Sequence, residues 1–363
     1  MKRVFIAATK QNDGKTTVAL GLIFNFQKVF KQIGFIKPVG QRYLEEEGLK
    51  IDEDTILIDE TLKLCGIKCN LKDMSPVAVE RGFTENYIAS PTRKAITKQI
   101  WEAFKRVAHK KDFVVIEGTG HAGVGSVFDH SNAVVARLLG SKVILISSGG
   151  IGRPIDEIVL NKALFEKEGV KLLGVIINKV MPEKFAKISR LVRKGLKRKG
   201  IEVLGVIPYN SSLSYPTIRQ ILKEADYKML FACSDTALDN HVAKIVIGAM
   251  HPKDAEKYIV DHSLVITPGG REDIISLALD LYGRGCKVAG IVLTGDLMPS
   301  EDFIHRTQQA AIPVLLAKQD TYTAASTIHG ITVKIRPTDK EKIETVKKLI
   351  HDYVDLDMIM RRM

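Results

Sequence analysis

The first seventeen residues carry the feature that most constrains the fold. An apolar run, Val4–Ala8, leads into a short polar loop, and Gly14, Lys15 and Thr16 then open an apolar-periodic segment. A strand, a tight loop and a helix in this order form a phosphate-binding loop, whose backbone N–H groups surround phosphate oxygens at the helix N-terminus. Thr9 stands where the usual G-x-x-x-x-G-K-[ST] pattern has its first glycine. The alternative is an ordinary strand–turn–helix opening of an α/β domain.

The residues of this loop have separate expected roles. In such a loop the lysine reaches the β- and γ-phosphate oxygens, and the following hydroxyl ligates Mg²⁺. We therefore predict that Lys15 binds phosphate and acts in catalysis, and that Thr16 is a magnesium ligand. ATP and Mg²⁺ are the expected cofactors. The residues predicted to contact the nucleotide here are Asn12, Asp13, Gly14, Lys15, Thr16 and Thr17.

Length and composition exclude several classes of protein. A chain of 363 residues suggests two domains, and 45% hydrophobic with 26% charged residues is an ordinary globular balance. No apolar run approaches the roughly 20 residues that a membrane span needs. The chain enters a strand directly after Met-Lys-Arg, so we expect no signal peptide and a cytoplasmic protein. Four cysteines do not suggest a disulfide framework, and no second ligand pair accompanies Cys65 and Cys69; the other two are Cys233 and Cys286.

The net charge of +12 raises the question of a nucleic-acid partner. Much of the excess lies in residues 184–199, where Phe185, Ile188, Val192 and Leu196 recur at helical spacing. The basic side chains then occupy the opposite face, which we interpret as a solvated helix surface. We expect no nucleic-acid and no membrane partner. The basic balance also suits anionic nucleotide ligands, or a thermophilic host.

Apolar β-type runs alternate with helical segments in the first part of the chain. The predicted strands are 2–8, 33–37, 112–117, 142–147, 171–178 and 203–207, and the predicted helices are 15–31, 54–64, 91–108, 130–140, 153–168 and 182–199. This alternation predicts an α/β fold with a mainly parallel sheet and helices on both faces. The domain is expected to cover residues 1–210, followed by a polar linker.

A second alternation predicts a smaller α/β domain over residues 214–335. Its expected strands are 264–267, 288–293, 313–316 and 332–335, with helices at 271–283, 299–309 and 320–328. Residues 336–363 are expected to form an amphipathic helix and a tail.

Three strand ends carry chemically informative residues. The second strand ends at Lys37, the third at Glu117 and Gly118, and the fifth at Asn178. Ligands in such sheets bind at the carboxyl ends of the strands, and an acidic residue opposite a phosphate loop commonly holds Mg²⁺. A carboxylate that caps neighbouring N–H groups is the alternative for Glu117. The Asn178 amide could read an adenine edge.

Together these residues resemble the dethiobiotin synthetase family. More closely, residues 1–210 resemble the dethiobiotin-synthetase-like N-terminal region of long phosphotransacetylases and of stand-alone two-domain relatives. The matching stretches are Gly14-Lys15-Thr16, Lys37-Pro38-Val39, Glu117-Gly118-x-Gly120, Gly174-Val-Ile-Ile-Asn178 and Gly205-Val-Ile-Pro208.

The resemblance implies roles for several of these residues. Lys15, Thr16 and Lys37 would handle phosphates and substrate, Asp54 and Glu117 would hold Mg²⁺, and Asn178 would contact the base. Gly118 and Pro208 are assigned to the cofactor site on the same grounds. Because Asp52 lies two residues before Asp54, the sequence leaves open which of them faces the metal.

Three residues depart from the dethiobiotin synthetase pattern or add to it. Gln11 and Gln41 stand where those enzymes have small hydroxyl residues that bind their substrate. Lys10 lies five residues before Lys15, a spacing similar to that of partition and division-site ATPases, in which this lysine reaches a partner subunit's nucleotide. We therefore predict a homodimer with Lys10 as a catalytic residue. The alternative for Lys10 is a solvent-facing loop charge.

The second domain resembles the domain called DRTGG. The resemblance rests on Leu264-Val-Ile-Thr-Pro-Gly-Gly-Arg271 and Gly290-Ile-Val-Leu-Thr-Gly295-Asp296, although the literal Asp-Arg-Thr-Gly-Gly string is absent. Such domains are usually regarded as regulatory or ligand-sensing. We recognise no acetyltransferase catalytic domain in the chain, so we expect that the protein is not a phosphotransacetylase.

Two classes of function follow. The first is a MgATP-binding protein with slow ATPase activity, coupled to metabolite sensing by the second domain. The second is an ATP-dependent ligase or kinase that activates a small carboxylate or carbamate, as in dethiobiotin synthesis or cobyrinate amidation. Gln11, Gln41 and the second domain favour the first class. The expected partner is a small-molecule ligand or substrate.

Overall fold

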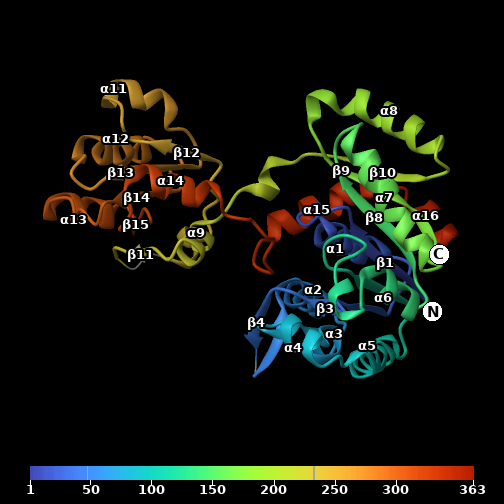
Figure 1. Ribbon diagram of the computed structural model, residues 1–363. Coiled ribbons are helices and arrows are strands. Elements are labelled where there is room, and N and C mark those ends of the chain that lie inside the picture. The colour runs from blue at the N-terminus through green and yellow to red at the C-terminus, as the bar shows by residue number, and fades with distance from the viewer. Residues whose placement is uncertain (47, 232–233) are drawn as a thin grey trace. The chain divides into compact units, whose positions relative to one another are not determined.

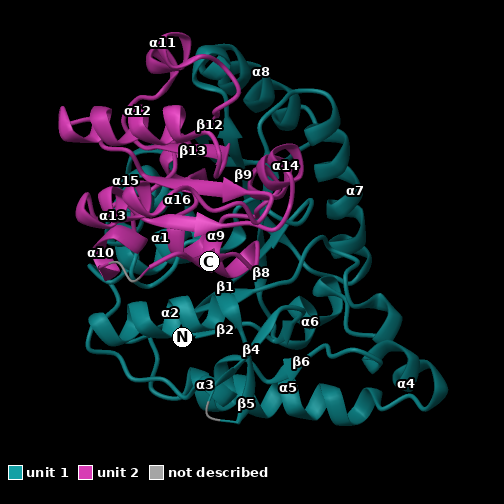
Figure 2. Cartoon of the chain, turned by 90° about the vertical axis from the view of Figure 1, so that its left-hand side faces the viewer, with its two compact units in different colours: residues 1–210, 335–363 teal, residues 211–334 magenta. Residues whose placement is uncertain are grey.

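A computed structural model describes residues 1–46, 48–231 and 234–363. The chain forms two compact units (Figure 2): residues 1–210 with 335–363 make unit 1, and residues 211–334 make unit 2. The C-terminal helices therefore belong to the same unit as the phosphate loop.

Unit 1 is built on a six-stranded sheet in the order β10-β9-β8-β1-β7-β2, and every neighbouring pair is parallel. The strands are β1 (Lys2–Ala8), β2 (Ile33–Ile36), β7 (Phe113–Glu117), β8 (Lys142–Ser148), β9 (Leu172–Val180) and β10 (Val203–Pro208). All six predicted strands are confirmed. Their central residues are fully buried because helices cover the sheet, as parallel crossovers require (Figure 1).

The helices of unit 1 lie at the predicted segments, and several are shorter than predicted. They are α1 (Lys15–Phe26), α2 (Glu53–Leu64), α5 (Arg93–Ala108), α6 (Asn132–Leu138), α7 (Arg153–Lys167), α8 (Phe185–Lys197), α15 (Lys340–Tyr353) and α16 (Leu356–Arg362). The prediction that the first helix runs to residue 31 is wrong. It ends at Phe26, and a turn brings Phe30 back to stack on Phe113 of β7, with ring centroids 5.2 Å apart.

An insertion between β2 and β7 was not predicted. It holds β3 (Val39–Gly40), β4 (Tyr43–Glu46), β5 (Leu49–Asp52), β6 (Val77–Ala78), α3 (Leu71–Met74) and α4 (Phe83–Ala89). These elements are too short to show a hydrophobic period. The antiparallel β4–β5 hairpin delivers Asp52 to the start of α2, where its carboxylate accepts from the Asp54 N–H at 3.0 Å.

Helix α15 is integral to unit 1 because it packs on α1. A Cβ added at Gly21 would lie 2.2 Å from Ile350 Cγ1, so the two helices pack closely there. The Asn25 side chain of α1 donates to the Lys347 carbonyl at 3.1 Å. Beyond the helix, the Asp355 N–H donates to the Leu204 carbonyl of β10 at 2.8 Å. The C-terminal segment thus completes the core around the phosphate-loop helix.

Unit 2 contains a five-stranded sheet in the order β11-β15-β14-β13-β12. The strands are β11 (Lys228–Met229), β12 (Lys244–Ile247), β13 (Ser263–Pro268), β14 (Gly290–Thr294) and β15 (Val314–Leu316), and only β11 runs antiparallel to its neighbour among these pairs. The helices are α9 (Ile218–Glu224), α10 (Asp235–Leu238), α11 (Pro252–Ala255), α12 (Glu272–Gly283), α13 (Glu301–Gln309) and α14 (Thr321–His329). Short 3-10 turns of the chain lie at Ser126–Phe128, Pro182–Lys184, Ser211–Ser214 and Glu256–Tyr258.

The predicted strand at residues 332–335 is wrong. β11 and β12 occupy the two edges of the sheet, and the Lys334 carbonyl accepts instead from the Gln220 side chain at 2.8 Å. The alternating sequence there therefore forms a connection rather than a strand.

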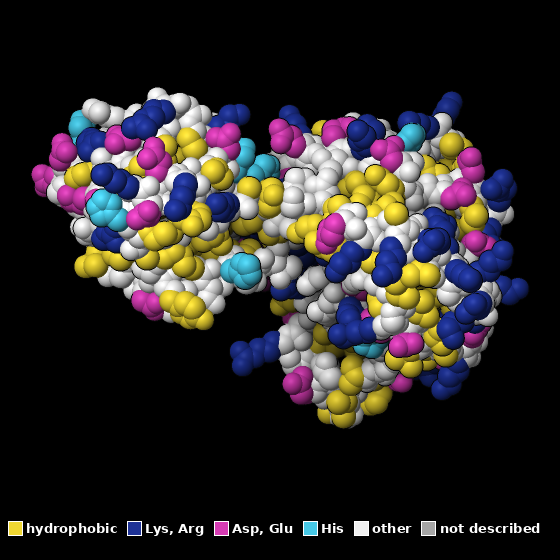
Figure 3. Space-filling view, turned by 90° about the horizontal axis from the view of Figure 1, so that it is seen from above, with side chains coloured by type: hydrophobic (Ala, Val, Ile, Leu, Met, Phe, Trp, Pro, Cys, Tyr) yellow, Lys and Arg dark blue, Asp and Glu magenta, His cyan; other side chains and the backbone are white. Residues whose placement is uncertain are grey.

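The basic segment 184–199 forms α8 and its flanks. Val192 and Leu196 are buried, whereas Lys187, Arg190 and Lys194 are exposed, which confirms the predicted amphipathic helix. Figure 3 shows Lys and Arg side chains gathered on this side of unit 1. None of the helices in the described ranges combines the length and apolarity needed to cross a bilayer. Cys65, Cys69 and Cys286 are free thiols, and Cys233 lies outside the described residues.

Candidate functional site

The carboxyl ends of the parallel strands in unit 1 bring the predicted site residues to one edge of the sheet. The chain runs outward from β1 to β2, returns to β7, and then continues on the other side of β1 at β8. Strand order therefore reverses at β1, and such a switch point is where open α/β sheets bind ligands. The phosphate loop follows β1, while Lys37, Glu117 and Asn178 come from β2, β7 and β9.

Asp13 shapes the phosphate loop through its side chain. The Asp13 carboxylate is buried and accepts from the Thr9 hydroxyl and the Lys10 N–H, each at 2.9 Å, and from the Ser148 hydroxyl. Thr9, which replaces the usual first glycine, therefore closes the loop with a hydrogen bond. Ser148 was not among the predicted site residues, although its position at the end of β8 could have indicated it.

Gly14 turns the loop into helix α1. Its φ of +100° lies in the left-handed region that glycine favours, and a Cβ there would lie 2.3 Å from the Asn178 side-chain nitrogen. Among the described residues, no side chain caps the start of α1 at Lys15. The N–H groups of its first turn, which include those of Thr16 and Thr17, can therefore bind an anion.

Lys15, Thr16 and Glu117 form the centre of the site. Lys15 is largely buried, which lowers the pKa of its ammonium group, and it forms no ion pair with any other described residue. The Thr16 hydroxyl donates to Glu117 Oε1 at 2.9 Å. Glu117 is fully buried, its Oε2 has no hydrogen-bond partner within the described ranges, and burial raises its pKa to about 7.

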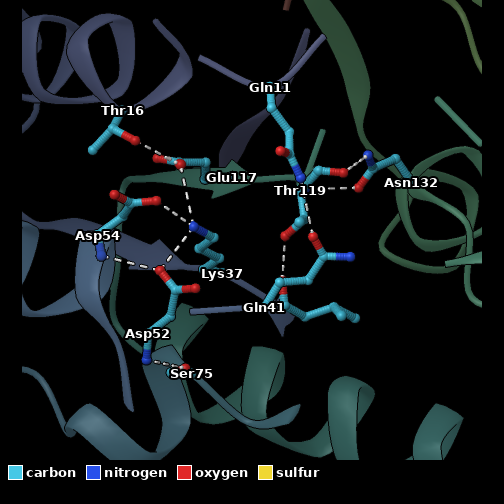
Figure 4. Close-up of polar contacts among 11 residues, drawn as sticks. Gln11, Thr16, Lys37, Gln41, Asp52, Asp54, Ser75, Glu117, Thr119 and Asn132 are labelled. Atoms are coloured by element: carbon cyan, nitrogen blue, oxygen red, sulfur yellow. Dashed lines mark hydrogen bonds and ion pairs between the residues drawn. The ribbon is translucent and has the colours of Figure 1, made fainter. Parts of the chain in front are cut away.

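Lys37 joins three carboxylates beside this centre. Its ammonium lies 2.7 Å from Asp52 Oδ1 and 3.7 Å from Glu117 Oε1, and it pairs with Asp54 as well (Figure 4). Burial opposes the charged form of Lys37, but the carboxylates outweigh it and raise the pKa of this lysine above its ordinary value. Burial also raises the pKa of Asp52. The sequence left open whether Asp52 or Asp54 faces the metal. In the structure both aspartates contact Lys37.

Gln11 and Gln41 meet on the other side of Glu117. The Gln11 amide donates to Gln41 Oε1 at 3.3 Å, which links the phosphate loop to the segment after β2 (Figure 4). Thr119, in the segment after β7, is held by Asn132, whose Oδ1 accepts from the Thr119 N–H at 3.1 Å (Figure 4). Asn132 also leaves no room for a side chain at Gly118, where a Cβ would lie 2.6 Å from its Oδ1.

The remaining predicted residues lie around the loop. Asn178 is buried and donates to the Asp13 carbonyl at 2.9 Å, so its amide contacts the loop itself. Pro208 ends β10, the strand next to β9. The Lys10 ammonium is 2.8 Å from Glu157 Oε1 of α7, and its side chain is 41% exposed. In residues 1–46, 48–231 and 234–363, no group of three or more His, Cys, Asp or Glu side chains is placed to hold a metal ion.

Two protein-family models match the chain. One, described as an AAA domain, matches residues 2–217, and the other, a DRTGG domain, matches residues 221–331. The chain belongs to the AAA-domain family. The sequence-based resemblance to a P-loop region followed by a DRTGG domain is thereby confirmed. Among solved structures, the MinC:MinD cell division protein complex from Aquifex aeolicus is 17% identical, with a TM-score of 0.38 over 59% of this chain and 84% of that one.

Curated relatives of this AAA-domain chain bear on the expectation that it is not a phosphotransacetylase. It is 27% identical to a phosphate acetyltransferase from Pseudomonas putida, over 100% of this chain and 52% of that protein. A phosphate acetyltransferase from Nitratidesulfovibrio vulgaris is 26% identical, over 97% of this chain and 50% of that protein. The expectation that the protein is not a phosphotransacetylase is therefore wrong. The chain spans about half the length of these relatives.

Proposed function

We propose that this chain is a MgATP-binding regulatory module with slow ATPase activity. The observation that carries the proposal is that two buried groups at the same edge of the sheet keep unused binding capacity: the Lys15 ammonium forms no ion pair with any other described residue, and Glu117 Oε2 has no hydrogen-bond partner among them. A buried charge without a partner is costly. A triphosphate with its divalent cation would supply the anion that Lys15 lacks and a partner for Glu117 Oε2, in addition to the Lys37 ammonium that lies 3.7 Å from Glu117 Oε1.

The donor set fits Mg²⁺ and a nucleotide. Mg²⁺ prefers oxygen ligands and is commonly held by one or two side chains together with substrate phosphates. Thr16 and Glu117 offer such oxygens. Asp54 offers another, and its carboxylate is ion-paired with Lys37. When bound, Mg²⁺ would neutralise charge on the phosphate oxygens. Lys15 and the N–H groups at the start of α1 would bind the phosphates, and Lys37 would offset the charge of the surrounding carboxylates.

Water is the acceptor that we propose for the terminal phosphate. Gln11 and Gln41 bridge the space in which the dethiobiotin synthetase resemblance would place a second substrate. Their amides replace the small hydroxyl groups of that pattern, and a polar substrate loses affinity steeply when its hydrogen-bond partners change. Slow hydrolysis is therefore favoured over ligase or kinase chemistry.

The DRTGG domain and the named relatives suggest what is regulated. We propose that the nucleotide state of unit 1, together with a small ligand of unit 2, controls phosphate acetyltransferase activity. The test is to measure acetyl transfer to phosphate with ATP, ADP and no nucleotide, alongside phosphate release from ATP. The proposal is supported if acetyl transfer depends on nucleotide, if Lys15→Ala removes this dependence, and if Lys28→Ala, at an exposed lysine, leaves the dependence intact. Acetyl transfer that ignores nucleotide, with no phosphate release, would contradict it.

A further inference from the structure

Two side chains at the end of β9 form hydrogen bonds with the backbone of the phosphate loop. The Lys179 ammonium donates to the Asn12 carbonyl at 2.6 Å, and the Asn178 amide donates to the next carbonyl, that of Asp13, at 2.9 Å. Lys179 N–H in turn donates to Asn178 Oδ1 at 2.9 Å, which fixes the orientation of that amide. Two consecutive loop carbonyls are thus held by two consecutive side chains.

This arrangement departs from regular strand geometry. Successive side chains of a strand point to opposite faces, so neighbours do not ordinarily contact the same loop. Lys179 has a φ of +57°, in the left-handed region that is uncommon for a residue other than glycine. The irregular backbone accompanies the contact of both side chains with the loop, and such local strain persists where the surroundings impose it.

Holding the carbonyls also sets the direction of the N–H groups. In a planar trans peptide, the C=O of one residue and the N–H of the next point in opposite directions. The Asn12 carbonyl turned toward Lys179 therefore turns the Asp13 N–H away from it, and the Asp13 carbonyl turned toward Asn178 does the same for the Gly14 N–H. Within the described parts of the chain, neither N–H donates to an acceptor.

We propose that Asn178 and Lys179 are positioning residues that preorganise the phosphate loop for anion binding. This inference rests on the proposed nucleotide binding and adds a mechanism to it. Asn178 then acts on the phosphate end of the ligand through the loop, rather than on the base. Its removal would weaken every ligand that contains a polyphosphate, whether or not a base is attached.

The test compares three ligands on the full chain by calorimetry: MgATP, MgGTP and inorganic tripolyphosphate with Mg²⁺. Lys179→Met keeps the side-chain stem and removes the charged hydrogen bond. We expect it to weaken all three ligands by the same factor, roughly tenfold. Lys179→Arg, which keeps a donor, should recover most of the affinity. Lys171→Met, at an exposed lysine just before β9, is the matched control and should change nothing.

Because Lys179 is exposed, its replacement should leave the melting temperature unchanged. Asn178→Ala should also weaken all three ligands alike. A loss confined to MgATP, with tripolyphosphate unaffected, would overturn the inference in favour of base contact. Unchanged affinities of Lys179→Met for all three ligands would also overturn the inference. In that case, binding of MgATP by the wild type would still support the proposed function. Absence of binding by the wild type would contradict both.

Discussion

Thr16 and Glu117 are joined by a hydrogen bond of 2.9 Å between residues 101 positions apart in the sequence. The bond connects the first turn of α1 to the end of β7, and so it places a hydroxyl and a carboxylate where the phosphate loop opens. Because Glu117 Oε2 has no partner among the described residues, the pair presents an oxygen that a cation can use.

The first prediction concerns pH. Under the proposed function Mg²⁺ would bind the ionised form of Glu117, and burial raises the pKa of this carboxyl group to about 7. Lowering the pH from 8 to 6 should therefore weaken MgATP binding roughly tenfold through this group. Glu117→Gln should bind MgATP weakly at both pH values and lose most of the dependence. Calorimetric titrations at the two pH values check this, and an equal slope in both proteins would refute it.

The raised pKa of Glu117 should also make the stability of the ligand-free protein depend on pH. Since folding raises the pKa of Glu117 from 4.5 to about 7, the folded state keeps its proton to higher pH than the unfolded chain. Its contribution to stability is present below pH 4.5 and is lost as the pH rises to about 7. Glu117→Gln should thus gain stability relative to wild type as the pH rises. A melting-temperature difference that is constant between pH 5 and 8 would be the contrary result.

The second prediction concerns Lys37. Removing it leaves Asp52, Asp54 and Glu117 together without their shared cation. Lys37→Met should therefore cost about 3–5 kcal/mol in the free energy of unfolding at pH 8, and less at pH 5, where carboxyl groups can take up protons. Adding Asp52→Asn should restore part of the loss. Urea denaturation at the two pH values measures this, and a cost independent of pH would count against the charge explanation.

The third prediction concerns the contact between α1 and α15. Gly21→Ala places a Cβ against Ile350, so we expect a loss of about 1–3 kcal/mol in the free energy of unfolding. Ile350→Ala alone should cost about 2–5 kcal/mol through the cavity it creates. The double variant should lose less than the two separate costs combined, because the smaller side chain on α15 makes room for the methyl group added on α1. Additive losses in chemical denaturation would show that the helices do not meet at this point.

The fourth prediction concerns Lys10 and the expected homodimer. In this chain Lys10 pairs with Glu157, yet its exposure leaves the ammonium accessible to a second subunit. If it acts on a partner's nucleotide, Lys10→Ala should bind MgATP nearly normally and lose turnover. Mixing it with Lys15→Ala should then restore turnover, because one mixed site keeps its own Lys15 and receives Lys10. A monomer by light scattering with MgATP, or wild-type turnover in Lys10→Ala, would remove the basis of this prediction.

Much of the site could be predicted because it follows from strand order. The central strands are apolar runs buried on both faces, such as Val114–Ile116, and these give a clear signal. Once the sheet is parallel, the residues that end its strands must meet at one edge. Lys37, Glu117 and Asn178 were therefore identifiable from the sequence, although the contacts that they make were not.

The rest depends on information that no local pattern contains. The β4–β5 hairpin that brings Asp52 to Lys37 consists of four-residue strands, too short for a period. The sequence of α15 shows that this helix has an apolar face. It does not show that α1 packs against that face. The positive φ of Lys179 accompanies a contact with Asn12, which lies 167 positions earlier in the sequence, and the residues next to Lys179 do not predict it.

The central claim is that Lys15 binds the phosphates of MgATP. Calorimetric titration of the full chain with MgATP at pH 8 tests it most directly, with Lys15→Ala and the exposed Lys28→Ala as paired variants. We predict saturable binding by the wild type and Lys28→Ala, and at least a tenfold loss in Lys15→Ala at an unchanged melting temperature. Equal affinity in Lys15→Ala and wild type, or no binding by the wild type, would contradict the account.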